Sequence, residues 1–113
     1  MKIKSYTDIK QSKKLSEILS IESADMVYCY TKKGDKLVSP IPIYLTGTPT
    51  NTFKYLYCWS LTALLNAIPS STLDSSDSHH YRIRCNERYS EWYDNSIDAC
   101  YNMILKLHEL NIL

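Results

Sequence analysis

Three arginines and two of the three tyrosines in residues 81–93 are the side chains in this sequence that are best suited to binding chemistry. An arginine guanidinium can donate two parallel hydrogen bonds to a phosphate or carboxylate, and a tyrosine ring offers a flat face beside it. This combination is suited to holding a nucleotide or another phosphorylated molecule. The predicted ligand-binding residues are Arg82, Arg84, Arg88, Tyr89 and Tyr93.

These side chains converge if residues 81–93 fold as a β-hairpin around a two-residue turn at Asn86 and Glu87. In that register the opposed pairs are Arg84 with Tyr89, Arg82 with Glu91 and His80 with Tyr93. The opposite face would carry Tyr81, Ile83, Cys85 and Trp92. A slip of one residue would exchange the two faces. The alternative is an ordinary exposed sheet face with a cross-strand ion pair between Arg82 and Glu91.

Nucleophilic catalysis needs a base within hydrogen-bond reach of the nucleophile, and no spacing in this chain predicts such a pair. Cys100 and His108 share one face of the C-terminal helix, but about 12 Å of helix rise separates them. A pairing of Cys58 or Cys85 with His80 is a weaker alternative. We therefore expect a protein that is not an enzyme.

The stretch SSTLDSSDSHH at residues 70–80 contains Asp74, Asp77, His79 and His80, which are residue types that ligate metals. Two adjacent histidines in a serine-rich loop are poorly preorganised, and no residues that would orient them are evident. The four cysteines are scattered singly without a CxxC pair, so they predict neither a zinc site nor a redox pair. We expect residues 70–80 to form a solvated surface loop, and we expect no metal and no cofactor.

A second hypothesis is that the chain binds another protein and no small molecule. Tyrosine and tryptophan dominate the energetics of protein interfaces, and the anchors would be Tyr55, Tyr57 and Trp59. In the alternative view, Trp59 packs beneath the central helix. Ten tyrosines beside one phenylalanine either serve recognition or reflect the codon bias of an AT-rich genome.

Composition indicates one globular domain over residues 1–113, because 44% of the residues are hydrophobic and 22% are charged. The net charge of +1 argues against non-specific binding of nucleic acid, and no sequence-specific binding is expected. The longest apolar run, residues 61–68, is too short to span a membrane. The N-terminus lacks the apolar stretch of a secretory signal. These features predict a cytoplasmic protein with no membrane partner.

Periodicity and turn signals predict an α+β fold with the element order α-β-β-α-β-β-α. The helices are expected at residues 8–19 with Thr7 or Ser5 as the cap, from Ser60 to just before Pro69, and from Asn95 to Leu113. The strands are expected at residues 26–31, 37–45, 81–85 and 88–93. We expect one small antiparallel sheet of about four strands, with the helices mainly on one face.

Pro40 and Pro42 predict that the strand at residues 37–45 lies at the edge of the sheet. The amides of residues i and i+2 point to the same side of a strand. The two prolines therefore remove the donors from one edge, while Ile41 and Ile43 can still pair on the other. An edge without donors discourages the addition of a further strand.

Three stretches resemble a family of small uncharacterised proteins encoded by phages and prophages of gut anaerobic bacteria. They are TDIKQSKKLSEILSIESADM at residues 7–26, CWSLTALLNAIP at residues 58–69 and DNSIDACYNMILKLHELNIL at residues 94–113. Together they cover about half of the chain. Related sequences often carry a proline where Ser96 stands; serine loses the preorganised first turn but leaves the helix cap intact.

The resemblance implies a phage accessory protein that acts by binding in the cytoplasm of a bacterial host. Such a protein would inhibit a host defence by sequestering an anionic nucleotide signal, and proteins of this kind usually form homo-oligomers. The alternative is an adaptor or inhibitor that binds a host protein. The resemblance supplies no catalytic residue.

Overall fold

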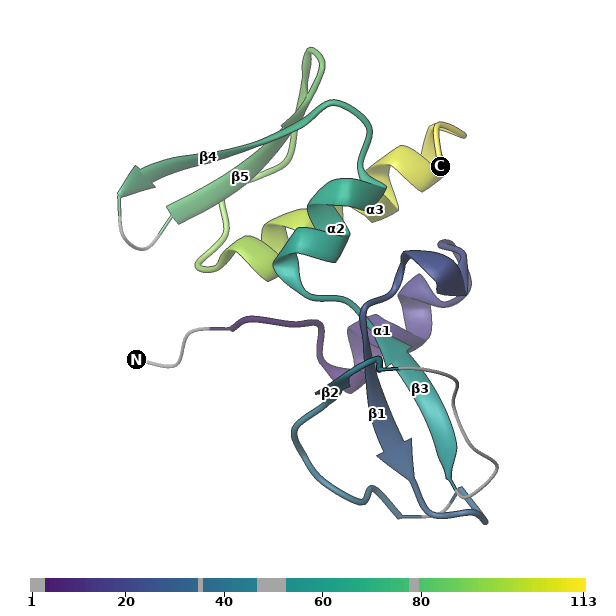
Figure 1. Ribbon diagram of the computed structural model, residues 1–113. Coiled ribbons are helices and arrows are strands. Elements are labelled where there is room, and N and C mark those ends of the chain that lie inside the picture. Colours follow the sequence, from purple (N-terminus) through teal and green to yellow (C-terminus); the bar gives the residue numbers. More distant parts are fainter. Residues whose placement is uncertain (1–3, 35, 47–52, 78–79) are drawn as a thin grey trace.

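The computed structural model describes residues 4–34, 36–46, 53–77 and 80–113. It confirms the α+β class, but the strands form two antiparallel sheets of three strands each, not one sheet of about four. Each sheet belongs to one of two lobes, which lie one above the other in Figure 1. We call residues 4–58 the N-terminal lobe and residues 59–113 the C-terminal lobe.

The N-terminal lobe contains two short helices and a sheet with the strand order β2-β1-β3. Its elements are α1 (Ile9–Leu15), the 3-10 helix η1 (Ile21–Ser23), β1 (Met26–Tyr30), β2 (Ile43–Tyr44) and β3 (Lys54–Cys58). Tyr6 and Ile9 pack against a buried cluster of Met26, Tyr28 and Cys58. Helix α1 and the residues before it therefore cover one face of this sheet.

The C-terminal lobe contains two helices and a sheet with the strand order β4-β5-β6. Its elements are α2 (Leu61–Ala67), β4 (Ser71–Asp77), β5 (His80–Cys85), β6 (Arg88–Tyr89) and α3 (Ser96–Glu109). Helix α3 packs against α2 and β5 and supplies six of the fourteen buried residues of the main core, among the residues described. Its buried residues are Ile97, Ala99, Cys100, Met103, Ile104 and Leu107.

Side-chain caps fix where the helices begin. The side chains of Asn95 and Ser60 each accept a hydrogen bond from a backbone N–H in the first turn of α3 and α2, as predicted. Helix α1 is capped by Asp8 through a reciprocal capping box, so the predicted cap at Thr7 or Ser5 is wrong. Helix α1 is also shorter than predicted, since it ends at Leu15.

Strand β2 lies at the edge of its sheet, as predicted, but it is shorter than the expected strand at residues 37–45. The backbone N–H of Leu45 donates to the Asp25 carbonyl at 3.0 Å. The backbone polar groups of Leu45 and Ile43 therefore point towards β1. Pro42, just before β2, is buried and has no N–H to offer a neighbouring strand. The two prolines interrupt the strand because neither can donate a hydrogen bond.

Two strands lie where the sequence pattern did not predict them. The described part of residues 70–80 forms β4, so the prediction of a solvated loop is wrong. Leu73 pairs with Ile83 and packs against the main core. This apolar contact holds the serine-rich segment against the rest of the lobe. Strand β3 follows the residues at 47–52 and pairs along the whole of β1.

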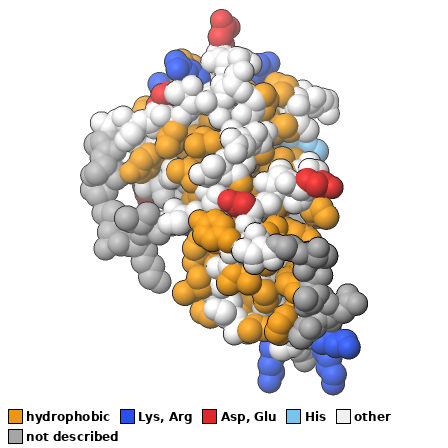
Figure 2. All heavy atoms as spheres, in the orientation of Figure 1, with side chains coloured by type: hydrophobic (Ala, Val, Ile, Leu, Met, Phe, Trp, Pro, Cys, Tyr) orange, Lys and Arg blue, Asp and Glu red, His pale blue; other side chains and the backbone are white. Residues whose placement is uncertain are grey.

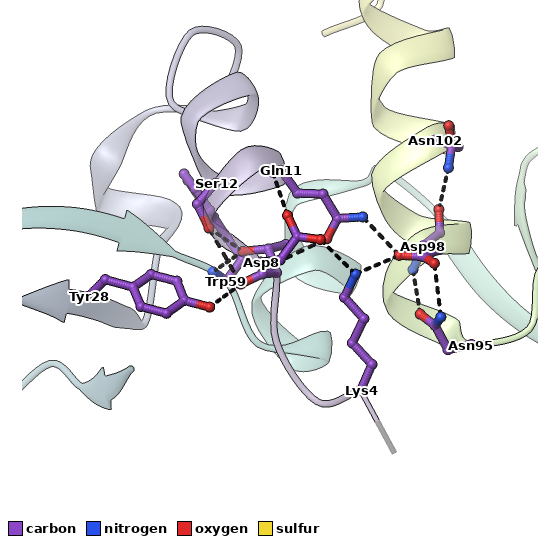
Figure 3. A network of polar contacts seen from close by, with 10 residues as sticks. Lys4, Asp8, Gln11, Ser12, Tyr28, Trp59, Asn95, Asp98 and Asn102 are labelled. Atoms are coloured by element: carbon purple, nitrogen blue, oxygen red, sulfur yellow. Dashed lines mark hydrogen bonds and ion pairs between the residues drawn. The ribbon is translucent and has the colours of Figure 1, made fainter. Parts of the chain in front are cut away.

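A polar network around Asp98 joins the two lobes (Figure 3). Its carboxylate accepts from Lys4 Nζ at 2.9 Å, from Gln11 Nε2 at 2.8 Å and from Asn95 Nδ2 at 2.9 Å. Burial alone would raise the pKa of Asp98, but these donors outweigh it and hold the pKa below its usual value. The network ties α1 and the segment before it to the first turn of α3.

Charge is divided unevenly between the two halves of the sequence. Residues 1–58 contain nine lysines and five acidic residues, whereas residues 59–113 contain four basic and seven acidic residues. The near-neutral net charge of +1 therefore conceals a basic half and an acidic half. Of the helices in the described ranges, none combines the length and the apolar character needed to cross a bilayer.

Candidate functional site

The predicted hairpin forms, but its register changes along its length. Arg84 pairs with Tyr89, as predicted. Further along, Tyr81 bridges Tyr93, so the predicted opposition of His80 with Tyr93 is wrong. The segment from Tyr89 to Tyr93 holds one residue more than the segment it faces, and this extra residue shifts the pairing. The predicted opposition of Arg82 with Glu91 is lost for the same reason.

Arg82 is engaged by neighbouring side chains on three sides. Its Nε lies 3.3 Å from Asp74 Oδ2, and its Cζ lies 4.4 Å from the ring centroid of Tyr89 and 4.6 Å from that of Trp92. Trp92 therefore shares the face of Arg82, and its predicted place on the opposite face is wrong. A guanidinium that already pairs with a carboxylate and stacks on two rings has little capacity left for an anionic ligand.

The five predicted ligand-binding residues do not share one face of the hairpin. Arg82 and Arg84 are two residues apart on β5, and Tyr89 pairs with Arg84, so these three lie on the same side. Arg88 pairs with Cys85 and therefore lies on the other side. Tyr93 is half-buried and packs against the main core, where burial, with Glu91 and Asp98 nearby, raises its pKa. The structure assembles three of the five residues.

Trp59 is a core residue. Its side chain is completely buried in the main core cluster, and its Nε1 donates to Ser23 Oγ at 2.9 Å. The expectation of an exposed anchor at Trp59 is therefore wrong, and the alternative of packing beneath the central helix holds. Tyr55 and Tyr57 are half-buried on β3. They pair with Cys29 and Val27 of β1, so both tyrosines lie on the sheet face opposite α1.

The largest run of exposed apolar side chains lies at and before β2. The exposed fractions are 52% for Val38, 62% for Ile41, 57% for Ile43 and 64% for Tyr44. We call these four residues the apolar strip. Figure 2 shows hydrophobic side chains gathered over the lower lobe, which contains β1, β2 and β3. No sequence signal distinguished these residues from an ordinary strand with one buried face.

The cysteines are placed as structural residues. Burial raises the pKa of the Cys58 and Cys100 thiols to about 12, and Asp25 adds to the effect at Cys58. Cys85 is also buried, and its Sγ donates to the Pro69 carbonyl at 2.9 Å. A thiol with such a high pKa is a poor nucleophile near neutral pH.

The described part of the fold does not bring the potential metal-ligating side chains of residues 70–80 together in one site. Asp74 pairs with Arg82, His80 begins β5, and His79 lies outside the described residues. Within the described ranges, no three residues of the types His, Cys, Asp and Glu are placed to hold one metal ion.

A shallow pocket of about 470 Å³ lies between η1 and α2. Its wall includes Glu22 and Asp25, but the Asp25 carboxylate already accepts from the backbone N–H and the hydroxyl of Ser60. The described wall of this pocket contains no lysine, arginine, histidine or cysteine.

Comparisons with protein-family models, curated proteins and solved structures found no match to this chain. The resemblance to phage proteins is therefore still a prediction from the sequence.

Proposed function

We propose that this protein is a non-enzymatic binding protein that docks a protein partner on its apolar strip. The supporting observation is that Val38, Ile41, Ile43 and Tyr44 are all more than half exposed within seven consecutive residues. Single exposed apolar residues are common, whereas a group of them is typical of interaction surfaces. Ile43 and Tyr44 are consecutive and lie on opposite faces of β2, so the strip covers both faces of this edge strand. In the phage context that the sequence resembles, the partner would be a host protein.

The shape of the β2 edge constrains how a partner can dock. Strand β2 is only two residues long, and Pro42 just before it has no N–H, so a partner strand would find few donors along this edge. A partner would therefore contact the side chains of the strip and would not extend the sheet. Half-buried Tyr57 pairs with Val27, which also pairs with Ile43, so β3 can add an aromatic anchor on the same face.

Sequestration of an anionic nucleotide on the arginine face is less favoured. Arg82 is already paired with Asp74, and Arg88 lies on the opposite face of the hairpin from Arg84. Substituting Arg82 and Arg84 by alanine remains the direct test of that hypothesis.

Site-specific photo-crosslinking tests the proposal. A photoreactive amino acid is placed at position 41 or 44, and at position 21 as the control, because Ile21 is 50% exposed but lies on η1. After irradiation in host cells, we expect the same protein to be joined at positions 41 and 44 and not at position 21. The captured protein is then purified, and its affinity is measured by calorimetry.

Variants of the strip separate binding from folding. Ile41→Asp should weaken binding of the purified partner by about tenfold or more, because it puts a charge into an apolar contact. Ile21→Asp should leave the affinity unchanged, and both variants should melt near the wild-type temperature. Equal affinity of the two variants would contradict the proposal. Crosslinks that join only two copies of this chain would also contradict it.

A further inference from the structure

A second pocket, of about 230 Å³, opens beside α1 where the chain turns from β1 towards β2. Its lining comes from α1, from the last residue of β1, from the first three residues of β3, and from the turn after β1. The lining residues are Lys13, Tyr30, Gly34, Lys54, Tyr55 and Leu56. None of these belongs to the apolar strip or to the arginine face.

Strand register places Lys54 on the same sheet face as apolar side chains of the pocket lining. Tyr30 pairs with Lys54, and Tyr28 pairs with Leu56, so all four side chains lie on the sheet face that α1 covers. Tyr30 and Leu56 therefore supply an aromatic ring and an aliphatic surface. Lys13 also lines the pocket, from α1.

Gly34 lies close to the stem of Lys54. Its φ of 75° lies in the left-handed region that favours glycine, and a Cβ there would lie 2.9 Å from Lys54 Cδ. The turn thus lies directly against the aliphatic part of Lys54. Contact along the stem limits the positions that the ammonium group can take.

The charge around the pocket is strongly positive. Residues 10–17, residues 31–36 and Lys54 together contain seven lysines, with Glu17 and Asp35 as the acidic residues. Glu17 lies 3.5 Å from Lys14. Among the described residues, neither Lys13 nor Lys54 has an ion pair or a side-chain hydrogen bond. Two uncompensated ammonium groups beside one pocket attract an anion.

We propose that this pocket binds a small phosphorylated molecule that carries one flat ring, such as a nucleoside monophosphate. Lys13 and Lys54 bind the phosphate, and the ring packs on Tyr30 and Leu56. The volume lies below the usual range of pockets for drug-sized ligands, which favours a mononucleotide over a dinucleotide. This inference is independent of the apolar strip.

Calorimetry with adenosine monophosphate and with inorganic phosphate tests the inference. The titrations are made at low salt, with each probe at up to about 10 mM, because a site with two exposed lysines gives modest affinity. We expect saturable binding, with the monophosphate about tenfold tighter than phosphate, since stacking adds to the charge interaction. The double variant Lys13→Gln/Lys54→Gln should lose about tenfold or more in affinity for the monophosphate.

The matched control is Lys10→Gln/Lys36→Gln. It removes the same two charges from α1 and the turn, at exposed residues outside the pocket lining. This control should lose less than about threefold, through long-range charge alone. Thermal melts confirm that both double variants fold. The inference is overturned if neither probe saturates, if both double variants lose the same affinity, or if the monophosphate binds no tighter than phosphate.

Discussion

Arg82 stabilises the hairpin through contacts with Asp74, Tyr89 and Trp92. We predict that Arg82→Ala lowers the free energy of unfolding by about 1–2 kcal/mol, from one partly exposed ion pair and two cation–π contacts. The free energy of unfolding of Arg82→Lys should lie between those of the wild type and Arg82→Ala, because lysine keeps the charge but not the planar group. Urea denaturation measures both. Arg84→Ala is the control and should be close to neutral; an equal loss there would contradict this account.

Asp98 should make the protein sensitive to acid. Its pKa in the folded protein lies below the ordinary value of 3.8, because donors from Lys4, Gln11 and Asn95 outweigh the effect of burial. Its stabilising contribution is therefore present above the unfolded pKa and is lost as the pH falls through the folded pKa. We predict that Asp98→Asn flattens the fall in stability below about pH 4.

Urea denaturation at a series of pH values checks this prediction. Asp94→Asn is the matched control, since Asp94 is an exposed neighbour just before the cap of α3. The control should keep the acid-dependent loss of the wild type. An Asp98→Asn protein whose stability falls as steeply as that of the wild type would show that the network does not favour the ionised carboxylate.

The connection between η1 and α2 depends on one acceptor. The Asp25 carboxylate accepts from the backbone N–H and the hydroxyl of Ser60, which is 7% exposed and caps α2. We predict that Asp25→Ala costs about 1–3 kcal/mol, because it leaves buried donors without an acceptor. Asp25→Asn keeps one side-chain oxygen and should cost less. Thermal and urea denaturation of the two variants would contradict this if both lost the same stability.

The helices could be predicted because their signals are local. Asn95 and Ser60 mark the starts of α3 and α2, and both caps form as expected. The strands depend on partners far along the chain. The segment containing Leu73 reads as a polar loop, yet it pairs with β5 and lies on the core. A local sequence pattern does not show a pairing partner that lies far along the chain. The pattern therefore predicts a loop in place of β4 and one sheet in place of two.

The candidate sites were harder to predict than the elements. The alternation of Arg82 and Arg84 was visible in the sequence, but the contact of Arg82 with Asp74 requires β4, which was predicted as a loop. The pocket beside α1 joins Lys13 to Lys54 across forty-one positions of sequence, and no motif links them. Exposure of the apolar strip likewise depends on both faces of β2 remaining uncovered.

The two hydrophobic clusters differ greatly in size. Among the described residues, the cluster within the N-terminal sheet has three buried residues, whereas the main core has fourteen, including Leu15 and Ala24 of the N-terminal lobe. We predict that amides of β1 exchange with solvent through a lower-energy opening than amides of α3, because fewer buried contacts oppose that opening. Hydrogen exchange followed by NMR compares Tyr28 with Met103. Equal protection of both amides, at the level of global unfolding, would contradict the prediction.

The uneven division of charge makes the molecule a sizeable electric dipole despite its net charge of +1. An anionic surface or ligand at low ionic strength would turn the molecule before contact, so that the end bearing most of the lysines arrives first. That end carries both the apolar strip and the pocket beside α1. Encounters with an acidic partner would therefore be oriented in advance, and their association rate would fall as salt is added.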